Sequence, residues 1–235
     1  MPDAYISLDG RRRAVTIVFG AIVAISVAAV ISDILYVGLV DRLLAGEDVS
    51  EAEAIAGDDR QSMMAVFQFG AWIAGAIVFI RWLHGAYKNV DVVARPERRY
   101  GHGWAIGAWF VPILNLWRPK QIVNDVWRAG GRDSQDAEPG WLLLIWWTAY
   151  IVSSFAWRFA DNIYEGEALD DLRNGTIAIM VSDGIDVIGA ILAILIVRAA
   201  TDRLDGRAAA KMAPPPQGPD AGWQAPEETP AGAPA

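Results

Sequence analysis

The stretch GHGWAIGAWFVPILNLWRPKQ, residues 101–121, decides the fold, because its path relative to a membrane sets the topology of everything that follows it. The 17 residues 101–117 hold no Asp, Glu, Lys or Arg. As a straight helix they would reach only about 25 Å at about 1.5 Å per residue, whereas the hydrocarbon core of a bilayer is about 30 Å thick. The segment is therefore at the lower limit of length for a crossing.

Pro112 shortens this reach further, because proline lacks a backbone donor and clashes with the preceding helical turn, at a cost of about 3 kcal/mol in a regular helix. We therefore expect a bend at Pro112. One helical face of the segment has a small-xxx-small pattern that favours close packing on a neighbouring span. Its residues are Gly103, Gly107, Phe110, Leu114 and Trp117.

The composition is typical of a membrane protein, with 54% hydrophobic residues and 11 Trp among 235 residues. A membrane-crossing helix needs roughly 17 to 25 mostly apolar residues, because its backbone groups must be satisfied within the segment. Besides residues 101–117, four stretches meet this requirement and are predicted to be spans. They are residues 14–40, 62–80, 139–157 and 175–197.

Loop charges predict the orientation of these spans, because short cytoplasmic loops carry an excess of Lys and Arg. Residues 1–13 hold three Arg, residues 81–100 hold five basic residues and residues 118–138 hold four, whereas residues 41–60 and 158–174 hold two Arg each against seven and five acidic residues. All loops obey the rule if residues 101–117 enter and leave on the cytoplasmic side. We therefore predict four spans, a re-entrant segment and two cytoplasmic termini. The alternative is a five-helix protein in which 101–117 is a short kinked span.

The predicted organisation has three parts. Residues 1–13 form a cytoplasmic N-terminus, residues 14–200 form a helical membrane domain, and residues 201–235 form a cytoplasmic tail. The tail is rich in Pro, Gly and Ala and is predicted to be disordered, because it offers too little apolar surface to offset the entropy of ordering.

Residues 119–129 are predicted to form an amphipathic helix, because Pro119 suits a first turn and apolar residues then recur at helical spacing. This helix either lies at the cytoplasmic interface of the membrane or packs on the protein itself. Its apolar face consists of Ile122, Val123, Val126 and Trp127, and its polar face of Lys120, Gln121, Asn124, Asp125 and Arg128.

A family resemblance follows from these elements. Trp82, Tyr87 and Asn89, then GWAIGAWFVPILNLWRP at 103–119 and Trp127 downstream, resemble the bacterial membrane family catalogued as domain of unknown function 4328. The resemblance covers roughly residues 60–200. It implies a multi-pass protein of the bacterial cytoplasmic membrane and carries no assigned activity. The motif residues of the re-entrant segment are Gly103, Gly107, Trp109, Phe110, Pro112, Asn115, Trp117, Arg118 and Pro119.

Seven of the 11 Trp fall between Trp104 and Trp147, which favours an aromatic belt at the headgroup level together with packing against the re-entrant segment. A cofactor box is the alternative interpretation, but no haem, flavin or nucleotide motif accompanies these residues. We predict no cofactor.

Polar residues within the predicted spans are the remaining functional signal, because a carboxylate at the bilayer centre costs about 2.5 to 3.5 kcal/mol and usually faces the bundle interior. One interpretation is structural: Asp33 pairs with Arg42 or Arg158, and Asp183 bonds Gln68, Ser153 or Ser154. Another is a proton or cation path. An intramembrane protease with Asp33 and Asp183 lacks the expected flanking motifs. The candidates are Asp33, Gln68, Asp183 and Asp186.

Other function classes are not supported by the sequence. A net charge of -8 argues against a general nucleic-acid binder. The absence of Cys excludes thiolate chemistry, and two His cannot by themselves build a typical zinc site. No nucleophile elbow, phosphate-binding loop, metalloprotease helix or EF-hand spacing is present. We therefore predict no catalytic residue and no metal ligand.

These observations predict an all-helical, non-enzymatic membrane protein that acts as a structural or interaction component. We expect lipid headgroups to contact Arg118, Lys120 and Arg128, and a protein partner or a second copy of the chain to bind elsewhere. The alternative is a small channel or transporter that uses the carboxylates of Asp33, Asp183 and Asp186.

Overall fold

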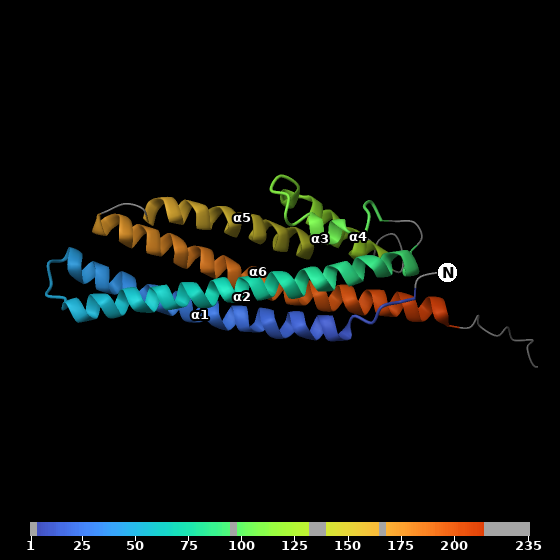
Figure 1. Ribbon diagram of the computed structural model, residues 1–235, viewed down its shortest axis with the longest axis horizontal. Coiled ribbons are helices and arrows are strands. Elements are labelled where there is room, and N and C mark those ends of the chain that lie inside the picture. Colours follow the sequence, from blue (N-terminus) through green and yellow to red (C-terminus); the bar gives the residue numbers. More distant parts are fainter. Residues whose placement is uncertain (1–3, 95–97, 132–139, 165–167, 214–235) are drawn as a thin grey trace, which may run out of the picture.

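The computed structural model describes residues 4–94, 98–131, 140–164 and 168–213, with the side chains of residues 157–164 excepted. These residues contain helices and no strand (Figure 1). The elements are α1 (Asp9–Leu44), α2 (Glu51–Val93), α3 (Trp104–Gly107), the 3-10 helix η1 (Leu114–Leu116), α4 (Arg118–Ala129), α5 (Trp141–Tyr164) and α6 (Leu169–Met212).

The helices α1 and α2 form a long hairpin. α1 has 36 residues and α2 has 43, and neither contains a proline that would interrupt it. The connection turns at Gly46, whose φ of 73° lies in the left-handed region that favours glycine. Ser50 then caps α2, because its side chain accepts a hydrogen bond from the Glu53 backbone N–H.

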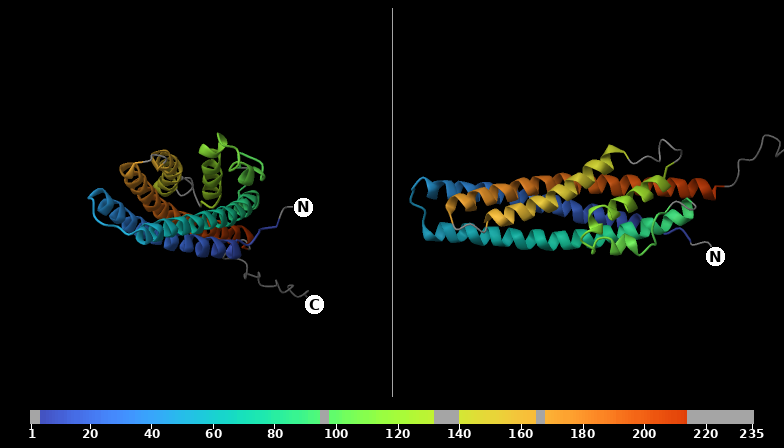
Figure 2. Two further views of the ribbon diagram at one scale, coloured as in Figure 1. Left: turned by 60° about the vertical axis from the view of Figure 1, so that its left-hand side comes forward. Right: turned by 90° about the horizontal axis from the view of Figure 1, so that it is seen from above.

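The four long helices lie side by side in the order α2, α1, α6, α5 (Figures 1 and 2). The α1–α2 connection and the start of α6 lie at one end of the molecule, which we call the hairpin end. α3, α4 and the N-terminal end of α1 lie toward the opposite end, which we call the α4 end. α4 packs on both α2 and α6.

Large apolar side chains cover the outside of the long helices. Ile17 on α1 is 71% exposed, and Val66, Phe69 and Trp72 on α2 are 70%, 65% and 64% exposed. Individual exposed apolar residues are ordinary, but a continuous apolar surface indicates contact with a partner or a membrane. α1, α2 and α6 are each long and apolar enough to cross a membrane.

The expected fourth span is helical, but its apolar character is described over only part of the length of a crossing. Its stretch, residues 139–157, corresponds to α5, whose apolar part in the described residues is Trp141–Ala156. Sixteen residues reach about 24 Å at about 1.5 Å per residue, which is less than the hydrocarbon core. The described residues therefore hold three helices that are both long and apolar enough to span a membrane, and not four.

The predicted tail also begins later than expected. α6 continues to Met212, so residues 201–212 are helical and not disordered. The reason is packing, because Thr201, Leu204 and Ala208 are buried against the rest of the molecule. Residues 214–235 lie outside the described residues.

The α4 end contains an aromatic core. Phe79 and Trp82 of α2 lie against Trp109 and Trp146, with ring centroids of Phe79 5.5 to 5.8 Å from the other three. Around these rings pack the buried residues of α4 and α6, among them Ile122, Val123, Ile196 and Val197. This core joins the segment after α2 to the long helices.

Candidate functional site

Asp183 of α6 is bonded to Gln68 of α2. The Gln68 Nε2 lies 2.9 Å from each of the two carboxylate oxygens of Asp183, and Asp183 is only 7% exposed. The predicted structural pairing of Asp183 with Gln68 is therefore present in the structure. It ties two helices that are not neighbours in the sequence.

The other two carboxylates have neutral partners of the same kind. Ser153 of α5 donates a hydrogen bond to Asp186 of α6. Gln61 Nε2 of α2 donates to Asp33 Oδ1 of α1 over 3.0 Å. The second oxygen, Asp33 Oδ2, is buried and has no hydrogen-bond partner among the described residues.

Of the two partners predicted for Asp33, Arg42 is wrong. Arg42 bonds Glu47 and Glu53 near the hairpin end and does not reach Asp33. Arg42 lies nine positions after Asp33 on α1, about 14 Å along the axis at about 1.5 Å per residue, which is too far for a direct bond. The side chain of Arg158, the other predicted partner, lies outside the described residues.

The three carboxylates converge on one level of the bundle. Asp183 lies within electrostatic range of both Asp33 and Asp186. Within the described residues, however, no group of three or more His, Cys, Asp or Glu side chains is close enough to hold a metal ion. The arrangement therefore consists of separate bonds between helices, one for each carboxylate.

The segment 101–117 folds back along α2. The His102 carbonyl oxygen lies 3.2 Å from His84 Nδ1, and the Trp109 ring then reaches Phe79, closer to the hairpin end. From η1, α4 leads the chain back to Gly130, where an added Cβ would lie 2.7 Å from Arg203 Cβ of α6. The Arg118 guanidinium, directly after the segment, lies 4.7 and 4.1 Å from the ring centroids of Tyr100 and Trp104, so the segment begins and ends close together.

Residues 101–117 lose helical structure over several residues, and not only at a single bend. α3 ends at Gly107 and regular structure resumes only at Leu114, so Pro112 lies within an irregular stretch. The predicted packing face is also wrong. No atom of another element lies within 4 Å of a Cβ added at Gly103 or Gly107, and Phe110 and Trp117 are 73% and 42% exposed.

The opposite side of α3 is the one that packs, because Ala105 and Ala108 are fully buried. A short helix can present either of two small-residue faces, and the sequence alone did not distinguish them. Trp109 follows and forms edge contacts with Phe79, Trp147 and Tyr150, at centroid distances of 5.8, 6.4 and 5.8 Å.

The end of the motif attaches to α5. Asn115 Nδ2 donates a hydrogen bond to the Tyr150 hydroxyl over 3.1 Å, and Trp147 Nε1 donates to the Leu116 carbonyl over 3.1 Å. These two bonds satisfy a backbone carbonyl and a side-chain amide of an irregular stretch within the protein.

The three residues predicted to contact lipid headgroups differ in their surroundings. The Arg118 guanidinium lies over the rings of Tyr100 and Trp104, at 4.7 and 4.1 Å from the centroids. Arg128 lies 3.9 Å from Asp125. Lys120 is half-buried at the start of α4, directly after Pro119, which occupies the first turn as predicted.

α4 packs on the protein along most of its surface, and its polar face is not fully exposed. Asp125 is 1% exposed. Its Oδ2 accepts hydrogen bonds from the Arg99 backbone N–H over 3.2 Å and from the Tyr87 hydroxyl over 3.3 Å. Its Oδ1 lies 3.3 Å from Arg99 Nε. Burial nevertheless raises the pKa of Asp125 above its ordinary value, against these bonds and charges.

Two other residues of the recognised motif also have defined structural partners. Asn89 donates to the Ile6 carbonyl and accepts from the Ile6 backbone N–H, both over 2.8 Å, and so fixes the segment that precedes α1. Trp82 Nε1 donates to Thr201 Oγ1 of α6 over 3.0 Å. Together with Tyr87, these side chains tie α2 to three different parts of the chain.

Sequence reasoning missed a polar stripe between α1 and α2. Ser32 accepts a hydrogen bond from Arg60 Nε over 3.0 Å, and Tyr36 donates to Asp58 over 2.6 Å. The signal was present, because Ser32 and Tyr36 are four residues apart on one helix and share a face. A hydroxyl group in an apolar helix can also bond its own backbone, so these residues did not by themselves indicate a partner on α2.

Comparison with known protein families gives one match. The model of the family described as Domain of unknown function (DUF4328) matches residues 45–202. Searches of curated proteins and of solved structures found no significant match.

Proposed function

We propose that this chain, which belongs to the DUF4328 family, is a non-enzymatic component of the bacterial cytoplasmic membrane that acts by binding lipids and a protein partner or second copy. The observation that carries the proposal is the apolar exterior of α1, α2 and α6, from Ile17 to Trp72 and beyond. Exposure of such an apolar surface to water is unfavourable, whereas contact with lipid chains or with the apolar face of a partner removes it from water.

The bonds of the polar groups support a structural role. Asp183, Asp186 and Asp33 each accept a hydrogen bond from a neutral side chain on another helix. A buried polar group is stabilised by such a bond and destabilises the fold when the bond is missing. These carboxylates therefore serve to hold helices together, and none is left as an obvious reacting group in a cleft.

The proposed topology has four crossings, with α5 as the fourth, and a re-entrant segment at 101–117. It is supported by the path of this segment, which begins and ends close together, and by the basic charges of the loops on either side of it. α5 reaches the length of a crossing because its 24 helical residues extend to Tyr164. Both termini are then cytoplasmic.

The absence of Cys makes this topology directly testable. We expect Asp48→Cys and Asp170→Cys to react with a membrane-impermeant maleimide in intact cells. Gly101→Cys and Ser134→Cys should react only after permeabilisation. Reaction of Ser134→Cys from the outside of intact cells, with Gly101→Cys protected, would show that 101–117 crosses the membrane and that the four-crossing topology is wrong.

A channel or transporter is the second candidate, and one observation favours it. Asp33 Oδ2 is buried and has no hydrogen-bond partner among the described residues, at the level where Asp183 and Asp186 also lie. Such an oxygen could accept a proton or a cation. Toward the α4 end, however, the aromatic core of Phe79, Trp82 and Trp146 fills the interior, so a polar path does not continue through the bundle.

A further inference from the structure

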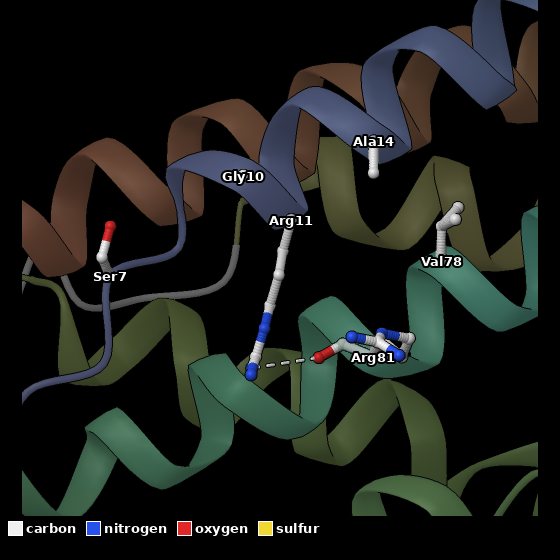
Figure 3. Close-up of a pocket in the computed structure, with 6 residues that line it drawn as sticks. All are labelled: Ser7, Gly10, Arg11, Ala14, Val78 and Arg81. Carbon is white, nitrogen blue, oxygen red and sulfur yellow. Dashed lines mark hydrogen bonds between the residues drawn. The ribbon is translucent and has the colours of Figure 1, made fainter.

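A hollow lies between the start of α1 and the middle of α2. Its volume is about 240 Å³, and it opens to the surface near the α4 end. Figure 3 shows the side chain of Arg11 extending from α1 across the gap toward α2. The lining residues are Ser7, Gly10, Arg11, Ala14, Val78 and Arg81.

Arg11 is positioned by the backbone of α2. Its Nη1 donates a hydrogen bond to the Arg81 carbonyl over 3.3 Å. A Cβ at Gly85 would lie 1.7 Å from this nitrogen, so only glycine leaves room for the guanidinium at this position. A guanidinium has five N–H donors, and this bond uses one of them.

The hollow carries positive charge without a counter-charge. Within the described part of the chain, neither Arg11 nor Arg81 forms an ion pair, whereas the adjacent Arg12 pairs with both Asp9 and Asp202. Lys88 is exposed two turns after Arg81 on the same face of α2. An anion in the hollow would meet two arginines and no carboxylate among its lining residues.

The two ends of the hollow differ in polarity. Ala14 and Val78 lie at the apolar end of the hollow, and Ser7 lies at the other end (Figure 3). Ala14 is three residues after Arg11, and Val78 is three residues before Arg81. Ala14 begins the apolar part of α1, and Val78 is near the end of that of α2. The hollow therefore lies where apolar helix surface changes to basic surface, as does the headgroup region of a membrane.

We propose that this hollow binds an anionic phospholipid, with the headgroup phosphate on Arg11 and Arg81 and the glycerol end against Ala14 and Val78. Arginine suits this ligand because its planar fork of donors matches phosphate oxygens. The proposal rests on the membrane location given above and adds a lipid class and a site to it.

Native mass spectrometry of the full-length chain in detergent tests this site without reference to topology. Dioleoylphosphatidylglycerol and dioleoylphosphatidylcholine are titrated separately. We expect tighter binding of phosphatidylglycerol, because the choline ammonium is repelled by the arginines. The double variant Arg11→Gln/Arg81→Gln should bind phosphatidylglycerol about tenfold more weakly, as loss of about 1.4 kcal/mol gives.

Matched variants separate the site from general charge and from folding. Arg13→Gln removes the same charge from an exposed position of α1 that does not line the hollow, and it should bind as the natural chain does. Gly85→Ala keeps every charge but displaces Arg11, so it should weaken phosphatidylglycerol binding. Gly70→Ala, where a Cβ meets nothing within 4 Å, should have no effect.

Three results would overturn the proposal. Unchanged phosphatidylglycerol affinity in both the double variant and Gly85→Ala would show that the hollow is not the site. An equal loss in Arg13→Gln would show a diffuse charge effect. Displacement of the lipid by inorganic phosphate at equal concentration would show a free-anion site. None of these outcomes bears on the cysteine labelling, which tests the topology separately.

Discussion

At the scale of single residues, Asp125 shows how burial and bonding compete. It accepts hydrogen bonds from Arg99 and Tyr87 and yet its pKa is raised, because removal from water outweighs these partners. The folded protein therefore holds the Asp125 proton to a higher pH than the unfolded chain does. Stability from this group is fully present below its ordinary pKa of 3.8 and is lost as the pH rises through the folded pKa.

We predict that Asp125→Asn removes this pH dependence. The Tm of the natural chain should fall relative to that of the variant as the pH rises from about 3.8, and the difference should become constant above the folded pKa. Thermal unfolding of both chains in detergent, followed by circular dichroism from pH 3.5 to 7.5, measures this. Asp170→Asn, at an exposed position of α6, controls for the loss of one negative charge. A difference in Tm that does not vary with pH would contradict the prediction.

The sequence predicted some of these residue environments and not others. Gln68 was one of three partners predicted for Asp183, because polar residues within apolar spans have few other partners, and it is the one that bonds. The burial of Asp125 was not predicted. Helical periodicity shows which residues share a face, but it does not show how many neighbouring elements cover the helix. α4 lies against both α2 and α6, so its polar face is covered as well.

At the scale of elements, the close approach of α4 to α6 depends on Gly130. An added Cβ would lie 2.7 Å from Arg203 Cβ, 3.1 Å from the Arg203 carbonyl carbon and 3.2 Å from the Leu204 nitrogen. Two of these atoms belong to the backbone, so no side-chain rotation relieves the contact. The φ of Gly130 is -82°, and the requirement for glycine is therefore one of space.

Gly130→Ala should separate the end of α4 from α6 and destabilise the fold by about 1 to 3 kcal/mol, as overpacking does. We expect a lower Tm and faster hydrogen–deuterium exchange at α4 amides. Gly101→Ala, where a Cβ meets nothing within 4 Å, is the matched control and should leave both unchanged. Equal exchange of α4 amides in both variants would show that this contact does not hold α4.

Element positions were predictable where one physical signal dominates. The length of the apolar stretches predicted α1, α2 and the apolar part of α6, and Pro119 together with helical spacing predicted α4. The ends of α2 and α6 were harder, because these helices continue beyond the apolar stretch into polar sequence. Their extensions are held by tertiary contacts such as Asn89 with Ile6 and Trp82 with Thr201, which no local pattern reports.

At the scale of the whole molecule, the two proposed functions differ in what the carboxylates do. In liposomes loaded with a pH-sensitive dye, we expect the natural chain to give no proton flux above that of protein-free liposomes. Asp33→Asn, Asp183→Asn and Asp186→Asn should leave this baseline unchanged, because each residue acts as a bond acceptor. Flux that the natural chain supports and that any of these variants abolishes, with equal folded yield, would favour the transporter instead.

The same carboxylates give a measurable structural outcome. Asp183→Asn keeps an oxygen that accepts from Gln68, whereas Gln68→Leu leaves the buried carboxylate without its donor. Gln68→Leu should therefore lower the free energy of unfolding more than Asp183→Asn does, by about 1 to 3 kcal/mol.

The placement of α1 between α2 and α6 also constrains how the protein is made. α1 meets α6 at both ends, through Arg12 with Asp202 and through Asp41 with Arg173. α1 is synthesised before α6, so the side of α1 that faces α6 stays uncovered until α6 has been made. During that interval lipid or a chaperone must shield this side of α1.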